Sequence, residues 1–248
     1  MLPRAYIPTP LSADTALDLP ASAARHVQVL RLQPGAAITL FDGRGGEWRA
    51  SVTGIGRKVV EVKVHEHVAR ESEAAIAVTV ALVMPANDRM DALVEKATEL
   101  GVAAIVPLLS ERSVLRLAAE RAERRLAHWQ AIAAAACEQC GRNRLPAIQP
   151  VQPLTAWLGS LPPATAQAPR LLLGWRDALP WHQATATVTG EVTLLSGPEG
   201  GFSQAEEDAA RLCSFVTTQL GSRVLRADTA PLACLAALAL RVPDTHWR

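Results

Sequence analysis

The sequence predicts an α/β protein whose β-rich first third precedes a longer part built around a parallel sheet. In the first third, residues 59–64 alternate apolar and polar side chains with a period of two, as a half-exposed strand does. From Ile76 on, short apolar runs such as residues 76–83 alternate with helical patterns. Strands that are apolar throughout are typical of parallel sheets covered by helices on both faces. The 248 residues, 49% hydrophobic and 20% charged, suffice for one large or two ordinary folded domains.

The first third is predicted to form a small β-barrel of about 70 residues. Strands are expected over residues 37–41 and 47–52, joined by a turn at Asp42-Gly43. Before them, residues 20–32 carry apolar side chains at helical spacing, which predicts one short helix. The charged segment 69–74 contains no β-branched residue, and we expect it to link the barrel to the rest of the chain.

The strands and helices of the longer part follow from apolar runs and capping signals. Gly101 ends the first helix, and Ser203 caps a later one whose acidic first turn suits the positive helix end. Residues 150–169, rich in Pro, Thr and Ala, are expected to form a variable connection. Further buried strands are predicted over residues 104–109, 171–174 and 192–197, and helices over residues 88–100, 118–140, 204–212 and 231–240.

Composition and charge narrow the classes of function. The formal net charge is only +1, so any contact with RNA must come from a local basic patch. Four cysteines are too few for a disulfide scaffold in a chain this long, and no segment has the pattern of a signal peptide or a membrane span. These features favour a cytoplasmic protein. Cys137 and Cys140 lack a second cysteine pair and a histidine at ligand spacing, so no metal is expected.

A glycine loop, Gly-Pro-Glu-Gly-Gly at residues 197–201, follows a predicted strand and precedes the helix capped by Ser203. Glycines there let the backbone approach a ligand closely, and the helix N-terminus offers free N–H donors. The pattern is neither the G-x-G-x-x-G of dinucleotide-binding loops nor a P-loop, which ends in Gly-Lys-Ser/Thr. A ligand-binding loop is the functional interpretation, and a tight turn without a ligand is the alternative.

Three further segments concentrate arginines. Arg223 and Arg226, followed by Asp228 and a helix, are suited to neutralise an anion, although taken alone the segment slightly favours a solvated helix start. Residues 110–116 follow a buried strand, at the sheet edge where ligands of open α/β sheets sit. Residues 141–144, Gly-Arg-Asn-Arg, end a helix with two cations and an amide that are suited to hold RNA phosphates.

Several of these segments together resemble one family. The sequence is similar, over nearly its whole length, to the bacterial 16S ribosomal RNA uracil-N3 methyltransferases of the RsmE type, which belong to the knotted SPOUT methyltransferases. The blocks that carry the resemblance are Pro3-Arg4-Ala5-Tyr6, Val29-Leu30-Arg31-Leu32, Asp88-Arg89-Met90-Asp91, Glu95-Lys96-Ala97-Thr98-Glu99-Leu100-Gly101, Ser110-Glu111-Arg112-Ser113, Ala136-Cys137-Glu138-Gln139-Cys140-Gly141-Arg142, Gly197-Pro198-Glu199-Gly200-Gly201-Phe202-Ser203 and Leu220-Gly221-Ser222-Arg223-Val224-Leu225-Arg226.

The resemblance implies two domains, a homodimer and a cofactor. Residues 1–70 are expected to form a PUA-like RNA-binding β-barrel, and residues 74–248 a SPOUT methyltransferase domain whose parallel sheet contains a trefoil knot. The expected methyl donor is S-adenosylmethionine, and the expected partner is 16S ribosomal RNA or the small ribosomal subunit. The active site is expected to be shared across the homodimer, without a membrane or a metal.

The resemblance also implies roles for individual residues. Three loops are expected to hold the donor, through Leu173, Gly174, Leu195, Gly197, Gly201, Leu220, Gly221, Ser222, Val224 and Leu225. RNA contacts are expected from Arg31, Arg112, Arg142, Arg144 and Arg223.

Catalysis is assigned to two arginines and an aspartate. Because uracil N3–H is a weak acid, the enzyme must stabilise the uracil anion, and a permanently charged arginine is suited to that. We assign this role to Arg226, with Arg4 reaching the substrate from the barrel, Asp228 as a weaker candidate base and Arg223 as the alternative to Arg226. The family usually has glutamate where this chain has Asp228, which shortens the reach by one methylene.

Two other functions stay open from the sequence. One is a non-catalytic RNA-binding factor associated with the ribosome. The other is a knotted methyltransferase that acts on another RNA, such as transfer RNA, or on a ribose hydroxyl.

Overall fold

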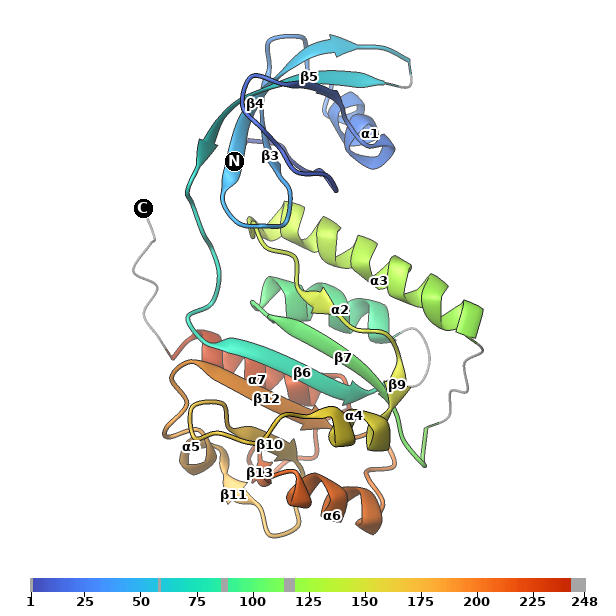
Figure 1. Ribbon diagram of the computed structural model, residues 1–248, viewed down its shortest axis with the longest axis vertical. Coiled ribbons are helices and arrows are strands. Elements are labelled where there is room, and N and C mark those ends of the chain that lie inside the picture. Colours follow the sequence, from blue (N-terminus) through green and yellow to red (C-terminus); the bar gives the residue numbers. More distant parts are fainter. Residues whose placement is uncertain (1, 58, 86–88, 114–118, 242–248) are drawn as a thin grey trace. The chain divides into compact units, whose positions relative to one another are not determined.

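The structure is a computed structural model that describes residues 2–57, 59–85, 89–113 and 119–241 (Figure 1). The chain divides into two compact units. Unit 1 contains Met1–Glu73 and Ala134–Leu145, and unit 2 contains Ala74–Ala133 and Pro146–Arg248. Among the described residues, no helix combines the length and the apolar character that crossing a membrane requires.

Unit 1 is built on one curled sheet with the strand order β1-β3-β4-β5-β2 (Figure 1). Among the described residues of this sheet, β1 and β3 pair in parallel, and the other pairs are antiparallel. Alternation along β5 explains the core, because Val60, Val62 and Val64 are fully buried whereas Glu61 and Lys63 are exposed. The elements of unit 1 are β1 (Arg4–Tyr6), β2 (Ala16–Asp18), α1 (Ala21–Val29), β3 (Ala37–Phe41), β4 (Glu47–Ile55) and β5 (Val60–Val68).

Most predictions for unit 1 are confirmed, and two strands were missed. Helix α1 and strands β3, β4 and β5 lie where the periodicity predicts them, although β5 continues four residues further, to Val68. Strands β1 and β2 have three residues each, too few for alternation to be read from the sequence. Strand β1 is important here because it carries Arg4.

Unit 2 contains an eight-stranded sheet in which every pair is parallel, with the order β11-β13-β10-β12-β6-β7-β8 and with β9 also paired to β7. The predicted fold class, α/β with a parallel sheet and a small β-rich N-terminal part, is confirmed. The strands are β6 (Ala77–Val83), β7 (Ala104–Leu109), β8 (Ala147–Ile148), β9 (Gln152–Pro153), β10 (Arg170–Leu173), β11 (Leu179–Pro180), β12 (Glu191–Ser196) and β13 (Phe215–Gln219).

Helices cover both faces of this sheet, which explains why its strands are apolar throughout. On β6, Val78, Val80 and Leu82 pack with α2, α3 and α7, whereas Ala81 and Val83 pack on the other face with α4 and α6. The helices are α2 (Arg89–Glu99), α3 (Ala119–Cys140), α4 (Leu154–Ser160), α5 (Trp181–Ala184), α6 (Gln204–Leu212) and α7 (Thr229–Ala239).

Two differences from the predictions concern elements near the candidate site. The connection 150–169 contains α4, whose Trp157 and Leu158 are buried. Strand β13 was not predicted, although its run of aromatic and β-branched residues, Phe-Val-Thr-Thr, is typical of a strand. The predicted starts of α2 and α3, Asp88 and Ala118, lie outside the described residues.

Candidate functional site

Three predicted ligand loops follow three neighbouring strands of the unit 2 sheet. Strands β13, β10 and β12 are adjacent and parallel, and Leu173 pairs with both Ser196 and Thr218. The strands therefore end nearly level, and Gly174 N donates to Thr218 O at 3.0 Å. The carboxyl ends of parallel strands are where open α/β sheets bind ligands. The structure thus brings the starts of the loops at Gly174, Gly197 and Leu220 to one edge.

The Gly197 loop is a tight turn that leads into α6. Gly201 has a φ of 66°, in the left-handed region that favours glycine, and its N–H donates to Pro198 O at 2.9 Å. A Cβ on Gly197 would lie 3.1 Å from the Phe202 ring. The backbone of the loop therefore favours glycine at Gly201, and a side chain at Gly197 would crowd the Phe202 ring. The turn and the ligand-binding interpretations are compatible, because such a turn also presents backbone N–H groups at a helix start.

Contacts with neighbouring segments hold this loop in place. The carboxylate of Glu206, in the first turn of α6, accepts hydrogen bonds from Ser203 N at 2.8 Å and from Glu111 N at 2.9 Å. The guanidinium of Arg112 donates to Gly200 O at 2.7 Å. The predicted segment 110–116 therefore attaches to the Gly197 loop, although its last residues, 114–116, lie outside the described residues.

The third loop presents two cations and a carboxylate. Arg223 and Arg226 are exposed, and neither side chain has a hydrogen-bond or ion-pair partner among the described residues. Asp228 stands at the N-cap of α7, yet its side chain makes no capping hydrogen bond. Its Oδ1 is buried and has no partner among the described residues. A buried carboxylate oxygen without a donor is costly, which points to a missing partner.

The predicted donor-binding residues differ in what they can offer. The side chain of Leu195 is fully buried in the core between the sheet and α4, so only its backbone is available. Leu173 and Leu225 are half-buried, and Gly221 and Val224 are exposed. A Cβ on Gly221 would meet no atom within 4 Å, and its φ of 96° favours glycine. The loop after β13 therefore has room beside its backbone.

Arg4 has a different environment in unit 1. Its side chain is 6% exposed, and Nη1 donates to Glu47 Oε2 at 2.6 Å. Nη2 donates to Asn143 Oδ1 at 2.6 Å and to the carbonyl of Arg142 at 3.2 Å, while the guanidinium lies over the Phe41 ring. This environment favours a structural role for Arg4 over the predicted contact with substrate.

The predicted phosphate-binding segment 141–144 is also engaged within unit 1. Arg142 is 4% exposed, and its Nε donates to both carboxylate oxygens of Glu73 at 3.2 and 3.1 Å. Asn143 Nδ2 donates to the carbonyl of Arg70 at 2.6 Å. Arg144, which is half-exposed, pairs with Glu71 at 3.0 Å.

We call this set of contacts the polar clasp; its members are Arg4, Glu47, Arg70, Glu71, Glu73, Arg142, Asn143 and Arg144. It fixes the segment after α3 to residues 70–73 and to β1. Arg142 is therefore buried within the clasp, whereas Arg31 is exposed.

Two titratable groups near the end of α3 have raised pKa values, and burial is the main cause of both shifts. Burial raises the pKa of the Cys137 thiol to about 12, which makes this thiol a poor nucleophile and metal ligand. Burial also raises the pKa of Glu138, whose Oε1 accepts a hydrogen bond from Tyr6 N at 2.8 Å. Among the described residues, no group of three His, Cys, Asp or Glu side chains gathers as metal ligands.

Sequence reasoning missed the double role of Glu206. The cap predicted at Ser203 is present, and Glu206 completes it as a capping box. The second partner, Glu111 N, comes from a segment 95 residues away in the sequence. No local pattern signals such a contact.

Family models match both units of the chain. The model for an RNA methyltransferase domain matches residues 72–239, and the model for an RNA methyltransferase PUA domain matches residues 19–64. Ribosomal RNA small subunit methyltransferase E from Synechocystis sp. is 33% identical, over 85% of this chain and 68% of that protein. The protein of the same name from Bacillus subtilis is 29% identical, over 86% of this chain and 85% of that protein.

Solved structures agree with these matches. Ribosomal RNA small subunit methyltransferase E from Neisseria gonorrhoeae, bound to S-adenosylmethionine, is 36% identical with a TM-score of 0.87, over 96% of this chain and 97% of that chain. A putative methyltransferase from Legionella pneumophila in complex with the same cofactor is 31% identical with a TM-score of 0.89, over the same shares of the two chains. The chain therefore belongs to the ribosomal RNA small subunit methyltransferase E family.

Proposed function

We propose that the protein transfers a methyl group from S-adenosylmethionine to N3 of a uracil in the 16S ribosomal RNA of the small ribosomal subunit, in the cytoplasm. The observation that carries this proposal is the level ending of β13, β10 and β12, from which three glycine-containing loops leave one sheet edge. The Neisseria gonorrhoeae and Legionella pneumophila proteins, which share this fold, are bound to that donor.

The residues of the three loops fit such a donor. Gly221 leaves open space where a side chain would project. Exposed Val224 and half-buried Leu225 and Leu173 offer apolar surface, which suits an adenine ring. The donor-binding residues of this proposal are Leu173, Gly174, Leu195, Gly197, Gly201, Leu220, Gly221, Ser222, Val224 and Leu225, with Leu195 contributing only its backbone.

The arginines and the carboxylate of the third loop perform the chemistry at the acceptor. The bound donor supplies a methyl group on a sulfonium, and a bond forms from uracil N3 to that methyl as the sulfur–methyl bond breaks. Arg226 stabilises the negative charge that develops on the uracil, because its charge is permanent and its fork meets two oxygens. Asp228, whose buried Oδ1 lacks a donor among the described residues, accepts the N3 proton. Arg223 holds the neighbouring RNA phosphate.

The N-terminal unit contributes RNA binding in this proposal. We divide the chain into a PUA-like RNA-binding barrel at residues 1–70 and a methyltransferase domain at residues 74–248, which contains a trefoil knot. The family-model matches over residues 19–64 and 72–239 support this division. Exposed Arg31 and half-exposed Arg144 offer cations to RNA on the first unit, and Arg223 offers one on the second.

The protein acts as a homodimer in this proposal. Helix α7 is apolar on all sides, a pattern typical of a helix buried all round. Nevertheless Ala233 and Ala237 are exposed on it, and Leu240 just beyond it is 86% exposed. A second copy of the chain would cover this apolar surface. Light scattering during size-exclusion chromatography is expected to give twice the mass of 26.4 kDa.

The proposal is tested by locating the product. Small ribosomal subunits are incubated with the protein and S-adenosylmethionine, and the 16S RNA is digested and sequenced by mass spectrometry. We expect one uridine to gain one methyl group on N3. A methyl group on a ribose, or on transfer RNA alone, would assign the chain to another RNA substrate. No methyl transfer to any RNA, together with no binding of the donor, would favour a non-catalytic RNA-binding factor.

A further inference from the structure

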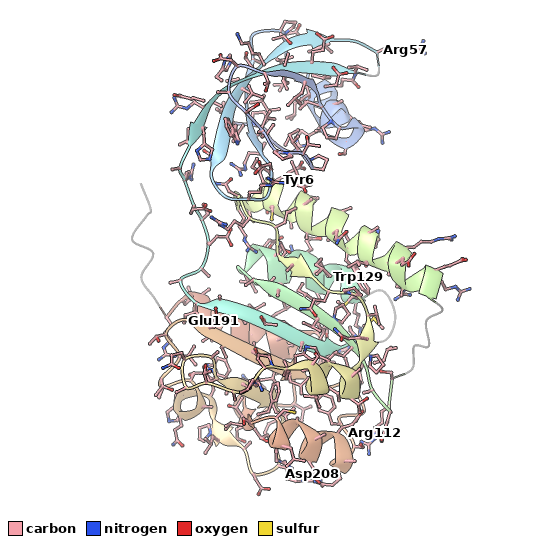
Figure 2. All side chains as sticks on the ribbon, viewed as in Figure 1. Tyr6, Arg57, Arg112, Trp129, Glu191 and Asp208 are labelled. Carbon is pink, nitrogen blue, oxygen red and sulfur yellow. The ribbon has the colours of Figure 1, made fainter. Side chains whose placement is uncertain are left out.

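Two side chains join the Gly197 loop to the segment that follows β7. Glu206 lies in the first turn of α6, and Arg112 lies three residues beyond β7, which ends at Leu109. Figure 2 labels Arg112, on the segment after β7, and Asp208, on α6. We call the contacts of Arg112 and Glu206 the loop lock. The whole lock lies within unit 2.

Glu206 is the buried half of the lock. The residue is 5% exposed, and its two carboxylate oxygens accept hydrogen bonds from two different segments, Ser203 N at 2.8 Å and Glu111 N at 2.9 Å. Only the first bond belongs to the capping box of α6. A buried carboxylate requires such donors, so the second bond obliges the Glu111 backbone to stay beside the start of α6.

Arg112 is the exposed half of the lock. Its Nη1 donates to Gly200 O at 2.7 Å and to Phe202 O at 3.3 Å. A guanidinium that donates to two carbonyls of one turn holds both carbonyls on its own side of the turn. No carboxylate pairs with Arg112 among the described residues, so its charge is directed at these carbonyls. A third contact, Arg89 with Glu199 at 3.6 Å, is longer.

We propose that Arg112 and Glu206 are positioning residues that hold the Gly197 loop in the shape that binds the methyl donor. This inference rests on the proposed function, since it concerns the donor loop of that same site. It also gives Arg112, which is expected from the sequence to contact RNA, the role of supporting the donor-binding loop. The segment after β7 then sets the affinity for the donor without touching it.

The chain offers closely matched variants for a test. Glu206→Gln keeps the shape of the side chain, but its amide nitrogen cannot accept, so one of the two backbone N–H groups then faces a donor. Arg112→Ala removes both bonds to the loop, and Arg112→Lys keeps the charge but places it on one ammonium nitrogen at the end of a more flexible chain. Asp208→Asn neutralises an exposed carboxylate on the same helix, and Arg124→Ala removes an exposed arginine on α3. Neither control residue belongs to the lock.

Calorimetric titration with S-adenosylmethionine measures the affinity directly. We expect Glu206→Gln and Arg112→Ala to weaken donor binding about tenfold, because each loses a charge-assisted hydrogen bond that orders the loop. Arg112→Lys is expected to retain part of the affinity, and both controls to bind as the wild type does. In single-turnover methylation at saturating donor, the variants should recover most of the wild-type rate, so the loss appears in KM rather than in kcat.

Three results would contradict the positioning role of Arg112 and Glu206, and one of them would assign Arg112 to RNA binding instead. Unchanged donor affinity in folded Arg112→Ala and Glu206→Gln would exclude positioning. Weaker RNA binding by Arg112→Ala, with a salt dependence reduced by about one phosphate contact and donor affinity intact, would return Arg112 to the RNA surface. A loss of kcat at saturating donor would indicate a role beyond loop shape. If the wild type itself does not bind the donor, the proposed function fails rather than the lock. Arg112→Ala, an exposed change, keeps the test valid if Glu206→Gln does not fold.

Discussion

Two pairs of arginines, one in each unit, have opposite environments in the structure. In the polar clasp of unit 1, Arg4 and Arg142 are buried, and each meets a glutamate, Glu47 and Glu73 respectively. In the loop after β13 of unit 2, Arg223 and Arg226 are exposed and have no side-chain partner among the described residues. The difference teaches that an arginine cluster indicates function only where its charge is left unmatched.

The largest expected effect is on the clasp. Arg142→Ala leaves the carboxylate of Glu73 without its partner, and we expect a loss of about 3 kcal/mol in the free energy of unfolding. Urea denaturation followed by circular dichroism measures this loss. Arg223→Ala is the control and should change the free energy of unfolding by less than about 0.5 kcal/mol. Equal free energies of unfolding for the two variants would show that the buried arginines of the clasp stabilise the fold no more than the exposed arginines of the loop after β13.

The next effect is on the rate of methyl transfer. Arg226→Ala should slow single-turnover methylation about 100-fold at saturating donor, because the uracil anion loses its counter-charge. Donor affinity and stability should stay near wild type. If Arg223→Ala shows the large loss instead, the catalytic role passes to Arg223.

Asp228→Asn is expected to slow methylation less than Arg226→Ala does. Unlike Arg142→Ala, it is not expected to lower the free energy of unfolding. Asp228→Asn should slow methylation about tenfold, since the N3 proton loses its nearest acceptor and must leave to solvent. The same change should leave the protein equally stable or more stable, because the buried Oδ1 has no donor among the described residues to lose. A marked drop in the melting temperature would instead indicate that Asp228 holds a structural bond, and would weaken its assignment as a base.

The smallest expected effect is on the pH dependence of stability, through Glu138 in unit 1. Burial raises the pKa of Glu138 above its usual value of 4.5, so the folded state holds this proton more tightly than the unfolded state. The contribution of Glu138 to stability is therefore largest below pH 4.5 and is lost as the pH rises through the raised pKa. Glu138→Gln should flatten this part of the stability profile, measured by thermal unfolding over a pH series. An unchanged profile would assign the pH dependence to other groups.

Much of the fold was predictable from the sequence because it is encoded locally. The alternation of Val60, Val62 and Val64 predicts β5, and the apolar run of β6 predicts a strand covered on both faces. The short strands β1 and β2 escape prediction, since three residues carry no readable period. Strand β13, which positions the loop at Leu220, has the aromatic and β-branched composition of a strand but is too short to show a clear period.

The candidate site was predictable in its loops but not in its contacts. The glycine pattern at residues 197–201 predicts a loop at the strand end, and the structure contains it there. Whether Arg4, Arg112 or Arg142 faces solvent depends on partners between 43 and 138 residues away in the sequence. Such pairings arise from tertiary packing, and no spacing rule within the chain anticipates them.

The central claim is that the loop after β13 forms part of the donor site, and two glycines test it most directly. Gly221 in that loop has a φ of 96°, and Gly35 in unit 1 has a φ of 92°; a Cβ on either would meet no atom within 4 Å. Valine at either position strains the backbone equally, so only the location differs. In calorimetric titration with S-adenosylmethionine, Gly221→Val should weaken binding at least about tenfold, whereas Gly35→Val should bind as the wild type does. Equal affinity in the two variants, or no binding by the wild type, would contradict the claim.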